Sequence, residues 1–328
     1  MPIFPETVSP RSPRVVAAAA FMLLLAAVPL VSNTIGESYH VTLVTRILVF
    51  GLAAVSLNLV LGYGGLVSFG HALYLGIGAY SVGILSFHGV TNGWIHLGVA
   101  VGLSALVSFL TGLVCMRTSG VAFIMITLAF AQMFYFLGVS LKQYGGDDGL
   151  SIPRRSDFSP LFSIQDNTGL YYFAFAVVAV TLYLSWRFVH ARFGRLLLGT
   201  RSNLRRMRAL GFPVLRYQVA AYVISGCICG VAGVLLANFT NFASPAYMYW
   251  TVSGDLIVMV ILGGIATILG PLVGAAVYVI LETVLSAYTQ HWMVILGPVI
   301  VLIALISNRG LYGLLLARDA QGSESDAP

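Results

Sequence analysis

Long uninterrupted apolar runs constrain this chain more than any other feature. Ten can be separated, at residues 15–32, 41–61, 66–88, 94–116, 120–141, 170–190, 216–238, 253–268, 270–288 and 291–307. A helix of about 20 apolar residues spans a bilayer, whereas a transmembrane β-strand alternates over about ten. Hydrophobic residues make up 59% of the chain and charged residues 9%, which leaves too few polar side chains to cover a soluble fold. The sequence predicts an all-α polytopic membrane protein with about ten transmembrane or half-membrane helices.

The basic residues are distributed unevenly between the predicted loops. With a cytoplasmic N-terminus and ten crossings, thirteen of the seventeen Lys and Arg residues fall on the cytoplasmic side. The other four are Arg46, Lys142, Arg154 and Arg155. Cytoplasmic loops of membrane proteins carry an excess of Lys and Arg, so we expect both termini to be cytoplasmic (N-in/C-in).

We expect a single transmembrane domain over residues 1–308. It contains a periplasmic loop at 142–169 and a cytoplasmic loop at 191–215, and a short disordered cytoplasmic tail follows at 309–328. Residues 15–32 are interpreted as a retained helix rather than a secretory signal peptide. This run is longer than a typical signal-peptide core and lacks a clean small-residue cleavage site.

One apolar segment, Leu61–Tyr80, contains six glycines, a serine and a histidine. Ile261–Tyr278 has a similar outline: a Gly-Gly pair, a hydroxyl residue, a glycine, and a small-residue helix that ends in tyrosine. Paired glycine-interrupted segments point to a transporter's substrate path, although small residues also serve helix packing. This weak internal repeat predicts path residues at Gly64, Gly65, Ser68, Gly70, His71, Tyr74, Gly263, Gly264 and Thr267, and the nearby carboxylate of Asp255 is a further candidate for the path.

Ionisable side chains inside apolar runs are costly and are functional candidates by default. Arg46 lies near an outer helix end and is interpreted as reaching the membrane surface. Asp255 either caps the short helix at 253–268 or faces the path, and Glu282 is interpreted as pairing with a neighbouring helix. His71 either relays protons or forms an ordinary inter-helix hydrogen bond.

Motifs that the chain lacks exclude several functions. The only lysine is Lys142, and no P-loop surrounds it. We therefore expect no ATP-driven chemistry in this chain by itself. No sequence motif predicts catalytic residues or a metal site. Cys115, Cys227 and Cys229 lie within apolar runs and are interpreted as small apolar side chains.

Two polar connections carry further candidate sites. In the cytoplasmic loop, Arg201–Leu210 predicts a short amphipathic helix that ends at Gly211. That helix could dock into a partner protein, or the loop could face lipid headgroups. In the outer loop, Asp147 and Asp148 are flanked by glycines. We expect them to form a turn that closes the outer mouth, because the loop offers too few oxygen ligands for a cation.

Together these elements resemble the membrane permease subunits of branched-chain amino-acid ABC importers, the LivM type, over residues 45–308. The matching motifs are Leu57–Leu59 with Leu61–Ala72 and Gly76–Tyr80, Thr127–Ala131, Gly145–Leu150, Gly194–Gly211 and Leu262–Gly274. Each motif is weak alone, but their order and spacing are specific. The first, middle and final motifs resemble the family's signatures, and Gly194–Gly211 resembles its ATPase-coupling loop.

The resemblance implies a transporter subunit of the bacterial inner membrane rather than an enzyme. A second homologous permease (LivH-like) would complete the pore, and a periplasmic binding protein would deliver the substrate. Two cytoplasmic ATPases, which bind ATP and Mg²⁺ themselves, would drive transport. No cofactor is expected in this chain, and no nucleic-acid partner; membrane lipid surrounds it. Binding-protein docking is expected at Asp147 and Asp148. ATPase coupling is expected at Arg201, Asn203, Arg205, Arg206, Arg208, Ala209 and Gly211.

The coupling loop departs from the family's pattern, because acidic residues usually follow the region of Arg201 and Asn203. Here those positions are Leu204, Arg205, Arg206 and Arg208, which predicts an ATPase partner with a compensating acidic groove. The resemblance favours branched-chain or related amino acids as the substrate; urea, amides and aromatic or carboxylic acids are alternatives within the class. An ion-coupled secondary transporter, with His71, Asp255 and Glu282 as coupling groups, is the alternative of a different class.

Overall fold

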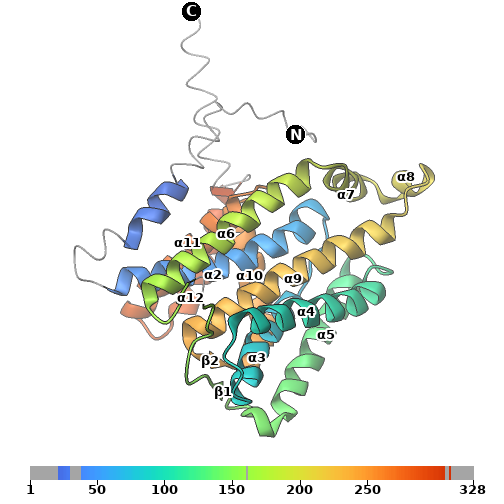
Figure 1. Cartoon of the computed structure of the whole chain (residues 1–328). Coiled ribbons are helices and arrows are strands. Elements are labelled where there is room, and N and C mark those ends of the chain that lie inside the picture. The colour runs from blue at the N-terminus through green and yellow to red at the C-terminus, as the bar shows by residue number, and fades with distance from the viewer. Residues whose placement is uncertain (1–20, 30–37, 160–161, 307–309, 312–328) are drawn as a thin grey trace, which may run out of the picture.

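The computed structural model describes residues 21–29, 38–159, 162–306 and 310–311, and these are almost entirely helical (Figure 1). Residues 21–29 form a helix within the first predicted run. The α-helices that follow are α2 (Ser38–Asn58), α3 (His71–Phe87), α4 (Gly93–Cys115), α5 (Val121–Ser140), α6 (Asn167–His190), α7 (Arg192–Ser202), α8 (Leu204–Ala209), α9 (Val214–Thr240), α10 (Trp250–Gly263), α11 (Gly270–Tyr288) and α12 (Trp292–Ile306). A π-helix, η1 (Leu59–Tyr63), extends α2, and the 3-10 helices η2 (Lys142–Tyr144) and η3 (Pro245–Met248) lie in connections.

A helix lies in each predicted run, which confirms the all-helical fold. Within the described residues, α2 with η1, α4, α5, α6, α9 and α11 are long and apolar enough to cross a membrane. The helices α3, α10 and α12 are apolar but shorter. The predicted orientation and the exact number of crossings remain predictions. The tail at 309–328 lies outside the described residues apart from 310–311.

Helices α2 and α9 form the centre of the bundle. In the most apolar windows of α2 and α9, 78% and 67% of the residues are buried, compared with 22% in α5. Helix α9 packs against α2, α3 and α4, and α2 also contacts α6, α10 and α11. The outer helices therefore present apolar side chains to lipid or to other subunits, while α2 and α9 hold the core together.

Close packing of α3 on α9 depends on small residues. A Cβ atom on Gly78 would overlap the carbonyl oxygen of Gly230, and one on Gly233 would overlap that of Leu75. On the next face of α9, Gly226 approaches Ser108 of α4. Helices in membranes associate through such close backbone contacts. Helix packing therefore accounts for part of the glycine content, including Gly76, whose Cβ would overlap the side chain of Met248.

The two ends of the bundle differ in structure. At one end, which we call the α8 end, lie α7, α8 and the turn between α4 and α5 (Figure 1). At the opposite end, the β end, strand β1 (Leu150–Ser151) pairs antiparallel with β2 (Phe242–Ala243) (Figure 1).

A polar cluster fixes the loop between α5 and α6 to the β end of α9. The guanidinium of Arg155 donates to the carbonyl of Asn238 at 3.1 Å and to that of Gln165 at 2.8 Å. The amide oxygen of Asn238 accepts from the backbone of Ser156 at 2.7 Å. Burial lowers the pKa of Arg155 and Asp166 raises it, but arginine stays charged in proteins. The loop is therefore anchored to α9 by a charged group with several partners.

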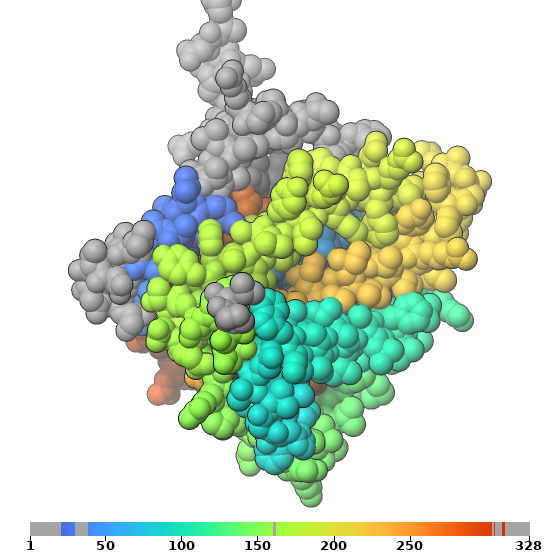
Figure 2. Space-filling model, viewed as in Figure 1, coloured from blue at the N-terminus to red at the C-terminus, as the bar shows by residue number. Residues whose placement is uncertain are grey.

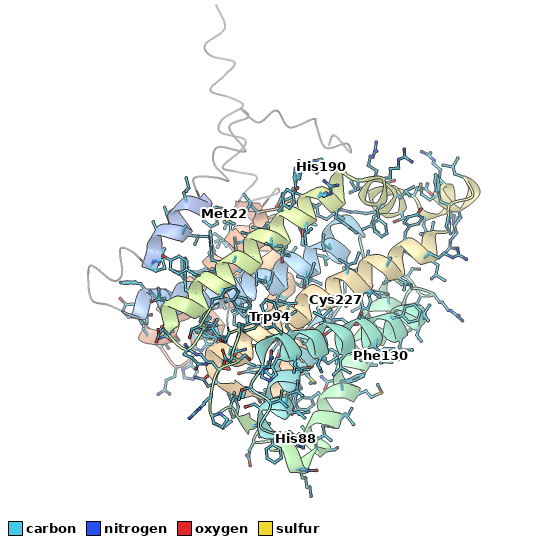
Figure 3. The ribbon with its side chains drawn as sticks, in the orientation of Figure 1. Met22, His88, Trp94, Phe130, His190 and Cys227 are labelled. Atoms are coloured by element: carbon cyan, nitrogen blue, oxygen red, sulfur yellow. The ribbon has the colours of Figure 1, made fainter. Side chains whose placement is uncertain are left out.

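A cavity of about 380 Å³ opens between α4, α6 and α9, and Figure 2 shows the hollow between α6 and α4. Its lining is apolar except for Thr181 and Cys227, and Figure 3 shows Cys227 on α9 in this region. All three cysteines are free thiols, and Cys115 and Cys229 are buried. A polar solute would find almost no hydrogen-bond partners here, so this hollow suits hydrocarbon rather than a polar substrate.

The glycine packing leads to a first prediction. We expect Gly78→Ala to destabilise the protein by about 1–3 kcal/mol, because the added methyl forces the backbones of α3 and α9 apart. The measurement is the unfolding temperature of the purified protein in detergent. Gly98→Ala on α4 is the matched control, since nothing lies within 4 Å of its Cβ position. Equal unfolding temperatures for the two variants would contradict this packing role.

Candidate functional site

The two glycine-interrupted segments meet at the α8 end through Asn58. Residues 64–70 separate η1 from α3, and residues 264–269 separate α10 from α11. The side-chain amide of Asn58 donates to the carbonyl of Thr267 at 2.7 Å, and its oxygen accepts from the backbone of Ala266 at 3.0 Å. Gly62 lies so close that its Cβ would be 2.8 Å from the Ala266 nitrogen. The two segments therefore form one connected unit.

Arg201 joins α7 to the same unit. It lies in the last turn of α7, and its guanidinium donates to the carbonyl oxygen of Gly62 in η1. Its methylene groups pack against Gly65, which has a φ of +69° and where a Cβ would be 2.8 Å from the Arg201 Cγ. We call Asn58, Gly62, Arg201, Ala266 and Thr267 the coupling node. A single π-helical turn within a helix often marks a functional site.

Helix α8 lies beyond the node and is exposed. The Asn203 side chain accepts from the Arg206 backbone at 2.9 Å and so caps α8, and Gly211, with φ of +81°, follows its end. No residue of α8 is buried, and Leu210 just after it is 65% exposed. Short polar helices with an exposed apolar residue suit contact with another protein.

The predicted single helix over Arg201–Leu210 is wrong in one respect: it is interrupted at Asn203. This residue adopts an extended conformation (φ −158°, ψ 96°) and ends α7 before it caps α8. The predicted coupling residues therefore divide into two groups. Arg201 is itself exposed but donates to the Gly62 carbonyl of η1. The residues that follow it are exposed on or beside α8: Asn203, Arg205, Arg206, Arg208, Ala209 and Gly211.

Several predicted path residues are buried inside this chain. Ser68, Gly70, His71 and Tyr74 are all buried. The Nε2 atom of His71 lies 2.7 Å from the Ser225 hydroxyl, which donates to the carbonyl of Ser56.

The His71 ring also packs edge-on against the rings of Tyr74 and Tyr222. The Tyr74 hydroxyl is 2.8 Å from that of Thr111 on α4. The structure thus shows His71 in an inter-helix hydrogen bond that links α3 to α9. A role in the substrate path stays a prediction for these residues.

The second segment is equally compact. The glycines at its start, Gly263 and Gly264, are buried, and a Cβ on Gly263 would overlap the carbonyl of Gly270. Thr267 donates to the carbonyl of Gly264 at 2.7 Å. At the node, this segment leaves Ala266 and Thr267 half-buried, and Gly65 of the first segment is exposed.

The ionisable groups within the bundle have defined partners. Asp255 accepts from the Tyr278 hydroxyl at 2.7 Å. It is the sixth residue of α10, so the alternative that it caps this helix is wrong: the helix already begins at Trp250. Arg46 pairs with Glu282 at 2.8 Å, which confirms the predicted pairing of Glu282 and shows that Arg46 binds a carboxylate rather than simply extending to the surface.

At the β end, Asp147 and Asp148 are exposed in a turn between η2 and β1. Gly145, Gly146 and Gly149 have positive φ values of 88°, 55° and 81°, a conformation that glycine adopts without strain. The predicted turn is therefore present, and both carboxylates point to a surface that another protein can reach. Among the described residues, no group of His, Cys, Asp or Glu could hold a metal ion.

Sequence reasoning did not assign a role to Asn58, Tyr278 or Ser225. Asn58 is the clearest omission, because a lone amide in the apolar run at 41–61 costs free energy unless its hydrogen bonds are made. From that cost one can predict that the Asn58 side chain forms hydrogen bonds with another segment. Its partners at residues 266 and 267 are more than 200 positions away, so the sequence alone did not identify them.

The chain matches known transport proteins over most of its length. The model of the family described as branched-chain amino acid transport system, permease component, matches residues 39–305. The high-affinity branched-chain amino acid permease protein LivM of Salmonella typhimurium is 26% identical over 83% of this chain and 69% of that protein. The probable LivM of Methanocaldococcus jannaschii is 26% identical over 78% of this chain and 85% of its own length. The LivH permease of Escherichia coli is 23% identical over 80% of this chain and 91% of its own length. No solved structure matches the chain.

The contact between the two segments can be tested by hydrogen exchange. We expect Asn58→Leu to accelerate amide exchange in residues 264–269, because the Ala266 amide loses its acceptor and the carbonyl of Thr267 loses its donor. A peptide from the middle of α11 provides the internal control and should be unchanged. Unchanged exchange at 264–269 would show that Asn58 does not hold this segment.

Proposed function

Because the chain belongs to the permease component family of branched-chain amino acid transport systems, we propose that it forms half of the translocation pore of an ATP-binding-cassette importer for branched-chain or related amino acids. A second, LivH-like permease completes the pore, two separate ATPases bind ATP, and a periplasmic binding protein delivers the substrate. The chain lies in the bacterial inner membrane. The coupling node is the observation that best supports this function.

The node supplies a mechanical link from an exposed helix to the membrane interior. An ATPase groove that holds α8 would move α7, which directly precedes α8 and is joined to it through Asn203. Arg201 would carry that movement to the Gly62 carbonyl, and Asn58 would carry it to residues 266 and 267. Both glycine-interrupted segments would then shift together. A transporter driven by an ion gradient has no need for such a link to an exposed helix.

The distribution of charge supports a cytoplasmic position for the α8 end. Basic residues gather in its loops and helix ends, at Arg117, Arg187, Arg192, Arg195, Arg201, Arg205, Arg206, Arg208 and Arg216. This agrees with the excess of Lys and Arg in cytoplasmic loops. The β end, with Asp147 and Asp148, then faces the periplasm, where the binding protein would dock on the glycine-flanked turn.

Docking of α8 can be tested by reversing its charge. We expect the double variant Arg205→Glu and Arg206→Glu to reduce co-purification of the ATPase at least tenfold, and transport-coupled ATP hydrolysis by the same factor. The two new carboxylates would be repelled by the negative charge of the acidic groove. Arg154→Glu, an exposed arginine at the β end, is the control and should leave co-purification of the ATPase unchanged. Normal coupled hydrolysis in the double variant would refute α8 docking into an acidic groove.

A second variant tests whether Arg201 transmits movement from α7 to η1. We expect Arg201→Met to leave the ATPase bound but to lower the number of substrate molecules transported per ATP several-fold, since the link to Gly62 is lost. Arg201→Lys should recover part of the coupling, and Arg195→Met, exposed on the same helix, should behave as the unaltered protein. The assay is leucine uptake and ATP hydrolysis in proteoliposomes that contain the whole importer. Loss of ATPase binding in Arg201→Met would instead assign Arg201 to docking.

A further inference from the structure

Four aromatic side chains from three separate segments meet on one surface of the bundle. Tyr135 of α5 contacts Tyr249, with ring centroids 5.2 Å apart, and Tyr249 is followed by Trp250 at 6.0 Å. Trp250 in turn lies 6.5 Å from Phe69 of the glycine-rich connection at 64–70. Tyr249 and Trp250 remain 37% and 38% exposed. We call these four residues the aromatic arc.

The arc extends from Tyr135, five residues before the end of α5, to Trp250, which lies near the middle of the membrane-spanning bundle. Met248 packs against Gly76 of α3, and the Ser253 hydroxyl accepts from the Ala72 backbone at 2.9 Å. Gly76 is eleven residues before the end of α3 at Phe87, a distance of about 16 Å along a helix. The hydrocarbon core is about 30 Å thick. Helix α10 therefore begins deep in the membrane, and residues 241–249 descend to it without an α-helix.

Polar groups along the arc have no hydrogen-bond partner within the described part of the chain. They are the hydroxyls of Tyr135 and Tyr249, the indole N–H of Trp250, and two neighbours: the amide of Gln132, one helical turn before Tyr135, and the hydroxyl of Thr251. Thr251 is exposed and Gln132 is half-buried. Tyrosine and tryptophan normally satisfy their polar atoms. A row of such groups at this depth is incompatible with contact by lipid tails.

Water or a polar partner must therefore cover the arc. A water-filled path would hydrate these atoms and leave the ring faces free to contact a solute. The arc also contains no charged side chain. Its chemistry suits a neutral or zwitterionic solute with an apolar side chain, which can pack against the rings while water solvates its polar groups.

We propose that the aromatic arc lines the substrate path and contacts the apolar side chain of the amino acid during transport. This inference rests on the proposed function, and it names contact residues for the substrate within the pore. It places this contact on the exposed face of Tyr249 and Trp250. The buried residues around His71 then hold α3 in position behind the arc.

The first test measures whether water reaches the arc. In a protein with Cys115, Cys227 and Cys229 replaced by alanine, Thr251→Cys should react with a charged, membrane-impermeant methanethiosulfonate in the assembled importer. Val180→Cys on α6, which is 57% exposed on the apolar outer surface, should not react. An unreactive Thr251→Cys would overturn the proposal, because the arc would then face lipid or protein.

The second test separates substrate contact from assembly. We expect Trp250→Ala to lower leucine uptake at least tenfold in proteoliposomes, while the second permease and the ATPases still co-purify. Trp186→Ala is the matched control, because Trp186 is 43% exposed on α6 and lies away from the arc. Loss of the second permease in Trp250→Ala would assign the arc to a subunit interface, and normal uptake would also overturn the proposal.

The same assay distinguishes this inference from the proposed function. If the unaltered importer takes up leucine and Trp250→Ala does so equally well, only the assignment of the arc is wrong. If the unaltered importer, loaded with its binding protein and ATP, does not transport leucine, isoleucine or valine, the proposed substrate class is wrong. In that case the labelling of Thr251→Cys still shows whether the arc faces water.

Discussion

The proposed coupling of α8 to the glycine-interrupted segments depends on the hydrogen bond from Arg201 to the Gly62 carbonyl. A non-helical or π-helical backbone inside a membrane protein needs partners for its polar groups, because lipid offers none. Here Arg201 provides a partner for the Gly62 carbonyl of η1, and Asn58 provides partners for the backbone of Ala266 and Thr267. The same contacts that make this broken backbone tolerable also connect α7 to both glycine-interrupted segments. In the proposed function, stability and transmission therefore have one structural origin.

Around this node, small residues and buried hydrogen bonds make α2, α3 and α9 a compact core. Glycine contacts bring α3 against α9, and Ser225 joins His71 to the backbone of α2. Close packing has low compressibility and transmits displacement. A movement applied to η1 at one end should consequently shift α3 as a unit. Helix α10, which begins deep in the bundle, brings Tyr249 and Trp250 to the surface beside that unit.

The sequence predicted much of the fold because apolar run length carries that information directly. The errors concern helix boundaries. Asn203 caps a new helix and so divides Arg201 from Arg205, and α10 begins at Trp250, five residues before Asp255. The contact between Asn58 and Thr267, and the ring contact between Phe69 and Trp250, arise only from tertiary packing. Glycine content indicated broken helices but did not reveal whether each glycine faces a path or another helix.

The most direct test of the central claim replaces the Arg201 link with a disulfide. In a background without native cysteines, Gly65→Cys and Arg201→Cys place their Cβ atoms close enough to be joined, since the Cβ position of Gly65 is 3.4 Å from the Arg201 Cβ. We expect the oxidised protein to transport more leucine per ATP than the reduced one, because the covalent bond restores a connection between α7 and the segment that directly follows η1. If oxidation leaves this ratio unchanged or lowers it, α7 does not transmit movement to the first glycine-interrupted segment and the proposed coupling is wrong.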